Sequence, residues 1–212
     1  MSSGSTSNPE PLAAIKARVR ARYRAVREAK TAEEAREGSA ALCRRLAGWD
    51  LVQRARRVMA YIAFRNELDL AALFEMRPAI EWIVPRVVAA RDGGPRDSGP
   101  AMALHPYDPA RLVRHRFGML EPAPDLPTVE PATLDVVLVP GVAFDRQGGR
   151  MGFGGGFYDG FLPTTNALRV GITYDDCLID AVPCDAHDQR MDWVFTPTQT
   201  LKVSPRRFVG HL

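Results

Sequence analysis

One glycine-rich stretch contains an arginine, a tyrosine and an aspartate that are candidates for binding or catalysis. Residues 148–161 read GGRMGFGGGFYDGF, in which Arg150, Tyr158 and Asp159 stand among glycines. Because glycine has no side chain, successive backbone N–H groups can close on a phosphate, above all where a helix begins. A guanidinium can bind the same anion through two nitrogens, and a carboxylate can hold Mg²⁺. The stretch therefore predicts a phosphate loop with a helix starting near Gly156; a flexible turn is the alternative.

The loop does not match the common nucleotide motifs. Gly152 and Gly154 fit the first two positions of GxGxxG, but position 157 is phenylalanine. The GxxxxGK[ST], HExxH and GxSxG motifs are absent, and the four histidines do not have zinc-ligand spacing. The motifs of dinucleotide enzymes, P-loop enzymes, zinc proteases and serine hydrolases are therefore missing.

A second acidic site follows later in the chain. The sequence AHDQRMD places Asp188 and Asp192 four residues apart, beside His187. Carboxylates near a phosphate loop suggest Mg²⁺, which takes few protein ligands and keeps several waters. The alternative is a solvated polar turn before a strand.

A third candidate is Glu67 in the sequence NELDL, just after a predicted strand that ends at Phe64. A carboxylate at the carboxyl end of a strand is well placed to accept hydrogen bonds from substrate N–H groups. The alternative is an acid at the start of the next helix, stabilised by the helix dipole.

The amino-terminal segment IKARVRARYRAVR forms a basic helix. Its cations are Lys16, Arg18, Arg20, Arg22, Arg24 and Arg27. Such a helix can be a solvated face, an RNA-binding surface, or a source of cations that reach a nucleotide phosphate.

The sequence around these candidate residues alternates between predicted helices and predicted strands. Apolar spacing predicts helices from Leu12 to Trp49, with a second helix starting after Thr31. The buried stripe of this second helix is predicted to consist of Leu42, Leu46 and Trp49. Strands are predicted at 56–64, 79–85 (ended by Pro85), 134–140, 168–174 and 191–197, and a further helix at 68–76. Residues 91–100 and the proline-rich stretch 121–133 are predicted as a loop and an extended linker.

This alternation predicts an α/β fold, with three layers (α/β/α) and a mainly parallel central sheet. In such sheets ligands bind beyond the carboxyl ends of the strands, where the loop after 134–140 lies. The 212 residues fit one domain, which we expect over 12–204, between a disordered leader (1–11) and a tail (205–212).

Composition narrows the class of protein further. The apolar fraction of 46% and the charged fraction of 25% are those of a globular protein, and no segment has the length of apolar sequence that a membrane span needs. Three cysteines without a CxxC pair indicate free, mostly buried thiols. We expect a cytoplasmic monomer that binds neither membrane nor nucleic acid.

The long segment PGVAFDRQGGRMGFGGGFYDGFL, taken with AHDQRMDWVFTP, resembles the 5-formyltetrahydrofolate cyclo-ligases, also called 5,10-methenyltetrahydrofolate synthetases. Lys16 and Arg20, Glu67 and the EP pair at 121–122 follow in the same order as the landmarks of that family. The resemblance covers residues 12–204, and the glycine-loop motif is its most specific part. Phe157 departs from it, because relatives often have tyrosine there.

The resemblance implies an ATP- and Mg²⁺-dependent ring closure. The γ-phosphoryl group of ATP passes to the formyl oxygen of 5-formyltetrahydrofolate, N10 attacks the activated carbon, and phosphate leaves to give 5,10-methenyltetrahydrofolate. The residues with an implied role are Arg150 and Tyr158 in catalysis; Lys16, Arg20, Arg150, Gly152, Gly154, Gly155, Gly156 and Tyr158 at ATP; Ile62, Glu67, Phe153, Gly154, Gly155, Gly156 and Phe157 at the folate; and Asp159 and Asp188 at Mg²⁺.

Two alternative functions remain open at this point. One is a relative of the cyclo-ligases that acts on another substrate. The other is a non-enzymatic RNA-binding module that uses the basic helix. The second alternative leaves the glycine loop and its aspartates unexplained, and the sequence has no RNA-recognition sheet motif or zinc knuckle.

Overall fold

The computed structural model describes residues 10–88, 101–116 and 118–203, and its centre is a seven-stranded sheet. The strand order is β12-β11-β9-β6-β1-β2-β3. The strands are β1 (Arg57–Met59), β2 (Glu81–Val88), β3 (Ala101–Pro106), β6 (Val136–Pro140), β9 (Leu168–Ile172), β11 (Trp193–Phe195) and β12 (Thr200–Lys202). From β11 to β2 neighbouring strands are parallel, and only the edge strands β12 and β3 are antiparallel. The predicted α/β fold with a mainly parallel sheet is confirmed.

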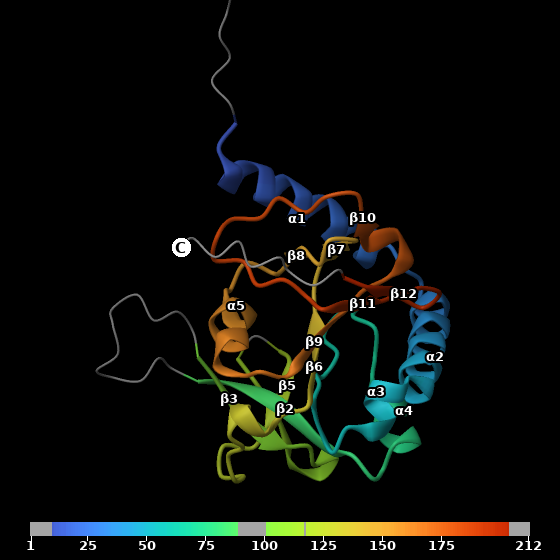
Figure 1. Cartoon of the computed structure of the whole chain (residues 1–212), viewed down its shortest axis with the longest axis vertical. Helices are drawn as coiled ribbons and strands as arrows, with labels where there is room; N and C mark the ends of the chain where they lie inside the picture. The colour runs from blue at the N-terminus through green and yellow to red at the C-terminus, as the bar shows by residue number, and fades with distance from the viewer. Residues whose placement is uncertain (1–9, 89–100, 117, 204–212) are drawn as a thin grey trace, which may run out of the picture.

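Both faces of this sheet are covered, because alternate residues of its strands point in opposite directions. In β6, Val136 and Leu138 belong to one core cluster, whereas Val137 and Val139 belong to the other. The first cluster includes residues of α2 (Ala32–Gly48), α3 (Asp50–Arg54) and α4 (Ala71–Met76). The second includes residues of α5 (Phe157–Phe161) and the 3₁₀ turn η3 (Leu162–Thr164), so three layers result (Figure 1).

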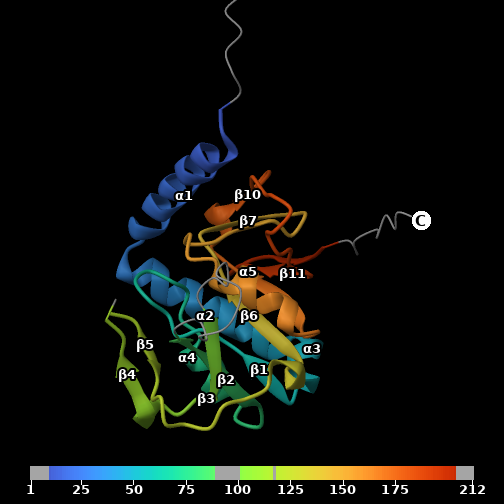
Figure 2. The same ribbon diagram turned by 90° about the vertical axis from the view of Figure 1, so that its left-hand side faces the viewer.

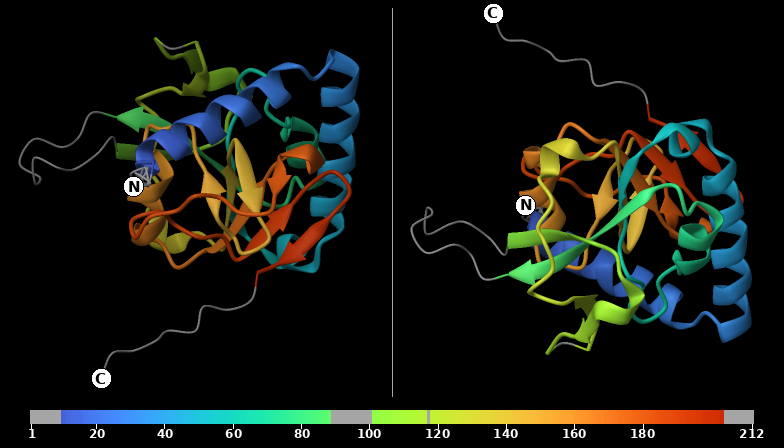
Figure 3. Two further views of the ribbon diagram at one scale, coloured as in Figure 1. Left: turned by 90° about the horizontal axis from the view of Figure 1, so that it is seen from above. Right: turned by 90° about the horizontal axis from the view of Figure 1, so that it is seen from below.

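Helix α1 (Leu12–Glu28) lies apart from these layers, across the end of the molecule that also carries a small second sheet (Figures 2 and 3). That sheet has the order β10-β7-β8 and consists of β10 (Leu178–Ile179), β7 (Ala143–Asp145) and β8 (Arg150–Met151). Val19 of α1 packs against its core. None of the described helices has the length and apolarity that crossing a membrane requires.

The second helix starts as the sequence predicts. Thr31 accepts a hydrogen bond from the backbone N–H of Glu34, and the Glu34 side chain accepts one from the backbone N–H of Thr31. This reciprocal capping box satisfies two N–H groups that a helix start otherwise leaves without partners. Leu42 and Leu46 are buried, which confirms two positions of the predicted stripe, whereas Trp49 is the C-cap of α2 and only partly buried.

The predicted end of a strand at Pro85 is wrong, because β2 continues to Val88. Beyond Ile83 the strand no longer pairs with β1 and keeps only β3 as a neighbour, in which Leu104 stands opposite Pro85. A proline lacks a backbone N–H, and a strand with one free side tolerates that loss.

Other predicted boundaries are also corrected. The strand predicted at 56–64 is shorter in the structure, where β1 covers only Arg57–Met59, because the chain leaves the sheet after Ala60. The proline-rich linker is interrupted: β5 (Leu120–Pro122) pairs with β4 (Leu112–Arg114), and η2 (Pro131–Thr133) follows. The remaining 3₁₀ turns are η1 (Pro109–Arg111) and η4 (Asp175–Cys177). The predicted loop 91–100, the tail 205–212 and most of the leader lie outside the described residues.

Candidate active site

Every residue to which the family resemblance gives a role lines one cavity of about 500 Å³. These residues are Lys16, Arg20, Ile62, Glu67, Arg150, Gly152, Phe153, Gly154, Gly155, Gly156, Phe157, Tyr158, Asp159 and Asp188. The cavity lies where parallel strands end: Tyr61 and Ile62 follow β1, and Pro140 is the last residue of β6. The structure therefore brings the predicted residues together, while the role of each stays a prediction.

The glycine loop forms one wall with an open backbone. Gly154 and Gly156 have positive φ angles of 100° and 69°, which other residues rarely adopt, and Gly156 is the N-cap of α5. Within the described residues, the backbone N–H groups of 153–158 donate to no acceptor. A run of free N–H groups beside a helix start is suited to binding an anion.

Arg150 lies behind this loop and is almost fully buried. Its Nη2 donates to Asp159 Oδ1 at 2.8 Å, and its guanidinium carbon is 5.6 Å from the centre of the Tyr158 ring. Gly152 makes room for it, since a Cβ at that position would lie 2.7 Å from Arg150 Nη1. Burial raises the pKa of the Tyr158 phenol, and the charge of Glu67 raises it further, so the hydroxyl stays neutral at physiological pH.

Asp145 anchors the turn that leads to Arg150, and the sequence did not single it out. Its buried carboxylate accepts hydrogen bonds from the backbone N–H groups of Gly149 at 2.7 Å, Val182 at 2.8 Å and Gln147 at 2.9 Å. A carboxylate that joins two loops in this way fixes where β8 and the glycine loop begin.

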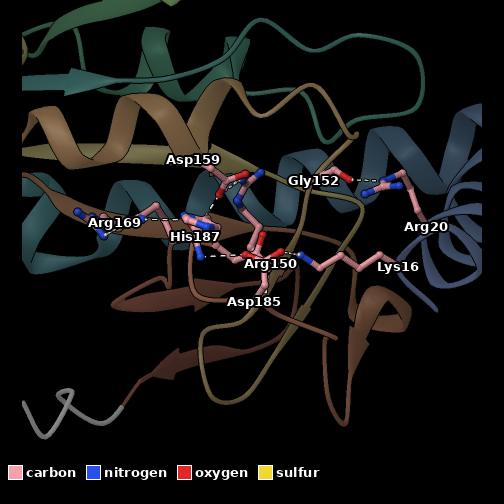
Figure 4. A network of polar contacts seen from close by, with 10 residues as sticks. Lys16, Arg20, Arg150, Gly152, Asp159, Arg169, Asp185 and His187 are labelled. Atoms are coloured by element: carbon pink, nitrogen blue, oxygen red, sulfur yellow. Dashed lines mark hydrogen bonds and ion pairs between the residues drawn. The ribbon is translucent and has the colours of Figure 1, made fainter. Parts of the chain in front are cut away.

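Helix α1 supplies cations to the same cavity. Lys16 Nζ lies 2.5 Å from Asp188 Oδ2 and 2.7 Å from Asp185 Oδ2, and Arg20 Nε donates to the carbonyl oxygen of Gly152 at 2.9 Å (Figure 4). Burial acts to lower the pKa of Lys16, but the hydrogen bonds to both aspartates hold it above its ordinary value. Lys16 is therefore a permanent cation, and α1 is tied to both the glycine loop and the 185–188 turn.

Glu67 lines the same cavity as the glycine loop. Its Oε2 accepts a hydrogen bond from the backbone N–H of Phe64 at 2.9 Å, and its Oε1 lies 3.7 Å from Arg27 Nη1. Burial raises the pKa of Glu67, and these two contacts counteract only part of that shift. The alternative role at a helix start is wrong, because α4 begins at Ala71 and Asp69 accepts the N–H of Ala71.

The two predicted metal ligands face the cavity, but each carboxylate already contacts a cation: Asp159 contacts Arg150, and Asp188 contacts Lys16. The described part of the chain holds no cluster of three or more His, Cys, Asp or Glu side chains suited to a metal. One or two carboxylates together with substrate phosphates are enough for Mg²⁺. Both hydrogen bonds to Asp159 use Oδ1, so Oδ2 can serve as a ligand, and the residues fit Mg²⁺ that arrives with a nucleotide.

Asp192 does not belong to this site. Its carboxylate accepts the backbone N–H of Arg169 at 2.9 Å, and it is absent from the cavity lining among the described residues. Of the two carboxylates in AHDQRMD, only Asp188 reaches the cavity.

Several further residues line the cavity that the sequence either left without a role at the site or did not mark at all. Arg24 and Arg27 continue the cationic face of α1, and their basic-helix pattern was the available signal. Met102 and Met119 add apolar surface, but no local pattern marks them. Glu121, of the EP pair, is buried and bonded to Arg86 at 2.8 Å, so it supports the wall.

Comparison with known proteins identifies the family. The profile of the 5-formyltetrahydrofolate cyclo-ligase family matches residues 13–197. The chain is 36% identical over 172 residues to the 5-formyltetrahydrofolate cyclo-ligase of Mycolicibacterium smegmatis, covering 78% of this chain and 85% of the relative. It is 31% identical over 177 residues to that of Escherichia coli K12, covering 82% and 95%.

A solved structure shares the architecture. The structure of 5,10-methenyltetrahydrofolate synthetase from Aquifex aeolicus superposes with a TM-score of 0.77 at 30% sequence identity, over 93% of this chain and 97% of that one. The family profile, the two relatives and the solved structure each match most of the chain. The chain therefore belongs to the 5-formyltetrahydrofolate cyclo-ligase family of enzymes.

Proposed function

We propose that this protein converts 5-formyltetrahydrofolate to 5,10-methenyltetrahydrofolate with ATP, releasing ADP and phosphate. The observation that carries the proposal is that one cavity is lined by both an open glycine loop and the buried carboxylate of Glu67. The loop offers N–H donors for phosphate, and Glu67 offers an acceptor for the N–H groups of a pterin ring. Both substrates can thus be held in one site.

The nucleotide lies along the glycine loop and α1. Lys16 and Arg20 contact its phosphates, together with Arg150, the backbone of Gly152, Gly154, Gly155 and Gly156, and Tyr158. The cations neutralise the phosphate charge, and the N–H groups fix its direction. Mg²⁺, when bound with ATP by Asp159 and Asp188, supplies further charge neutralisation at the phosphates.

The folate occupies the other part of the cavity. Glu67 accepts hydrogen bonds from the pterin N–H groups, Ile62 gives an apolar wall, and Phe153, Phe157 and the glycines between them close over the ring. The formyl group then faces the γ-phosphoryl group. Phosphoryl transfer depends on such positioning and on charge neutralisation more than on covalent help from the protein.

The reaction balances as two steps. The formyl oxygen takes the γ-phosphoryl group from ATP, releasing ADP, which turns an amide oxygen into a leaving group. N10 then attacks the formyl carbon and loses its proton, the C–O bond breaks, and phosphate leaves with the former formyl oxygen. Arg150 stabilises the charge on the transferred group, and the neutral Tyr158 hydroxyl donates a hydrogen bond to it.

The structure also bears on the RNA-binding alternative. The α1 cations Lys16, Arg20, Arg24 and Arg27 line the cavity instead of forming a separate outer surface. This supports their use with a nucleotide and folate. We propose that the enzyme acts in the cytoplasm as a monomer.

The test is to mix the protein with ATP, Mg²⁺ and 5-formyltetrahydrofolate and follow the near-ultraviolet absorbance of the methenyl product. Product should form only when ATP is present, with one ADP for each product. Folded protein that makes no product would overturn the proposal. Parallel reactions with other formylated substrates separate it from a relative with a different substrate, which would show the higher kcat/KM on one of those.

A further inference from the structure

Arg27 is a buried cation of the cavity lining to which the proposed function assigns no specific contact. It stands at the end of α1 and is only 5% exposed. Its Nη1 lies 3.7 Å from Glu67 Oε1, and its guanidinium carbon lies 4.7 Å from the centre of the Phe153 ring. One side chain thus contacts both the Glu67 carboxylate and an aromatic ring of the glycine loop.

Packing alone does not explain this placement. Within the described residues, the guanidinium of Arg27 donates no hydrogen bond, and its buried Nε has no partner. Burying a guanidinium with so few partners costs stability, so a fold that needed only to fill this space would be better served by an apolar side chain. The charge and the flat shape of the group must therefore matter to something in the cavity.

The surroundings of Glu67 show what the charge does. Glu67 accepts the backbone N–H of Phe64 and lies 3.7 Å from the guanidinium of Arg27. The phenols of Tyr61, Tyr158 and Tyr174 are near enough for the charge of Glu67 to raise their pKa values. Burial raises the pKa of Glu67, while the Phe64 N–H and Arg27 lower it. Arg27 is the one cation within ion-pair distance of Glu67 in the described part of the chain, so it favours the ionised carboxylate.

The flat face of the Arg27 guanidinium has a second role, which is to hold the Phe153 ring. Phe153 is 40% exposed and its loop contains Gly154, with a positive φ, so little else in its own segment holds the ring in place. A guanidinium stacked on an aromatic face stabilises one orientation of the ring. Since Arg27 also contacts Glu67, the positions of Glu67 and Phe153 are linked through one side chain.

We propose that Arg27 is a positioning residue for the folate: it keeps Glu67 ionised and directed into the cavity, and it seats Phe153 over the substrate. This inference rests on the proposed function, because it assigns Glu67 and Phe153 to the folate. It makes Arg27 a determinant of folate affinity that acts without contacting the phosphates. ATP binding should therefore not depend on it.

The experiment compares Arg27→Gln, Arg27→Lys and Phe153→Leu by steady-state kinetics over a range of pH. Arg27→Gln should raise the KM for 5-formyltetrahydrofolate about tenfold and change the KM for ATP by less than about twofold. The acidic limb of its kcat/KM profile for the folate should move to higher pH, because Glu67 loses the cation that favours its ionised form. Arg22→Gln is the matched control, since Arg22 is an exposed arginine of α1 outside the cavity lining, and it should leave both KM values and the profile unchanged.

The other two variants separate charge from shape. Arg27→Lys keeps the charge, so its acidic limb should stay near the wild-type position, but it loses the flat face. It should raise the folate KM about threefold, as should Phe153→Leu, and the double variant should be no worse than either one. If the effects of Arg27→Lys and Phe153→Leu on the folate KM add in the double variant, the link between Glu67 and Phe153 through Arg27 is refuted. These two variants provide the test even if Arg27→Gln does not fold.

The outcomes distinguish this inference from the proposed function. If the wild-type protein makes no methenyl product, the proposed function fails. If the wild-type protein is active and folded Arg27→Gln keeps both its folate KM and its acidic limb, only the role of Arg27 fails. If both KM values rise together, while kcat falls and the limb does not move, Arg27 has a structural role alone and the inference is wrong.

Discussion

The variant Asp145→Ala tests, through the free energy of unfolding, whether Asp145 anchors the glycine loop. Its carboxylate is 4% exposed and accepts three backbone N–H groups, of which those of Gly149 and Val182 are buried. Asp145→Ala leaves these two donors without a partner. At about 2 kcal/mol for each unsatisfied buried donor, the free energy of unfolding should fall by about 4 kcal/mol.

Urea denaturation followed by circular dichroism measures this loss. With a slope of about 2 kcal/mol per molar urea, the midpoint should fall by about 2 M. Asp135→Ala is the matched control: its exposed carboxylate also accepts two backbone N–H groups, those of Arg56 and Arg57, but water can replace it. The control should lose less than about 1 kcal/mol. An equally small loss in Asp145→Ala would refute the reasoning that this carboxylate fixes the loop.

Three further predictions concern the cavity. Glu67→Gln should raise the folate KM but also stabilise the protein. Burial raises the pKa of Glu67 in the folded protein above its value in the unfolded chain. The wild-type protein therefore loses stability as the pH rises through the folded pKa and Glu67 ionises, whereas the glutamine variant does not. Its unfolding free energy relative to wild type should thus increase from about pH 4 to about pH 7, and a difference independent of pH would contradict this. Asp159→Asn should lower kcat at least about tenfold and require more Mg²⁺, whereas Asp192→Asn should not; a change within about twofold would remove Asp159 from the metal site. Lys16→Met should raise the KM for ATP about tenfold and Lys16→Arg much less, as measured by initial rates; an unchanged KM would exclude contact with the phosphates.

The parts of the structure that could be predicted are those that local sequence determines. The continuous apolar run in β6 predicts a buried parallel strand, and Thr31 with Glu34 predicts the start of α2. The glycine loop and the following short helix were also predictable, because positive φ at Gly154 and Gly156 is a property that the residue type itself allows.

The parts that could not be predicted depend on contacts between distant segments. The strand around Pro85 continues because β1 ends beside it, which the residues near Pro85 do not reveal. Asp145 binds Val182, and Arg27 meets both Glu67 and Phe153, only after the chain has folded. In the sequence alone, Asp145, Arg27 and Glu67 resemble ordinary surface charges.

The proposed function predicts that an oxygen atom passes from one substrate to the other, and an isotope experiment measures this directly. The enzyme is given ATP, Mg²⁺ and 5-formyltetrahydrofolate labelled with ¹⁸O in the formyl group, and the released phosphate is analysed by mass spectrometry. Transfer of the γ-phosphoryl group to the formyl oxygen requires each phosphate to carry the labelled atom. Methenyl product accompanied by unlabelled phosphate would contradict the transfer, and with it the use of this cavity to join the two substrates.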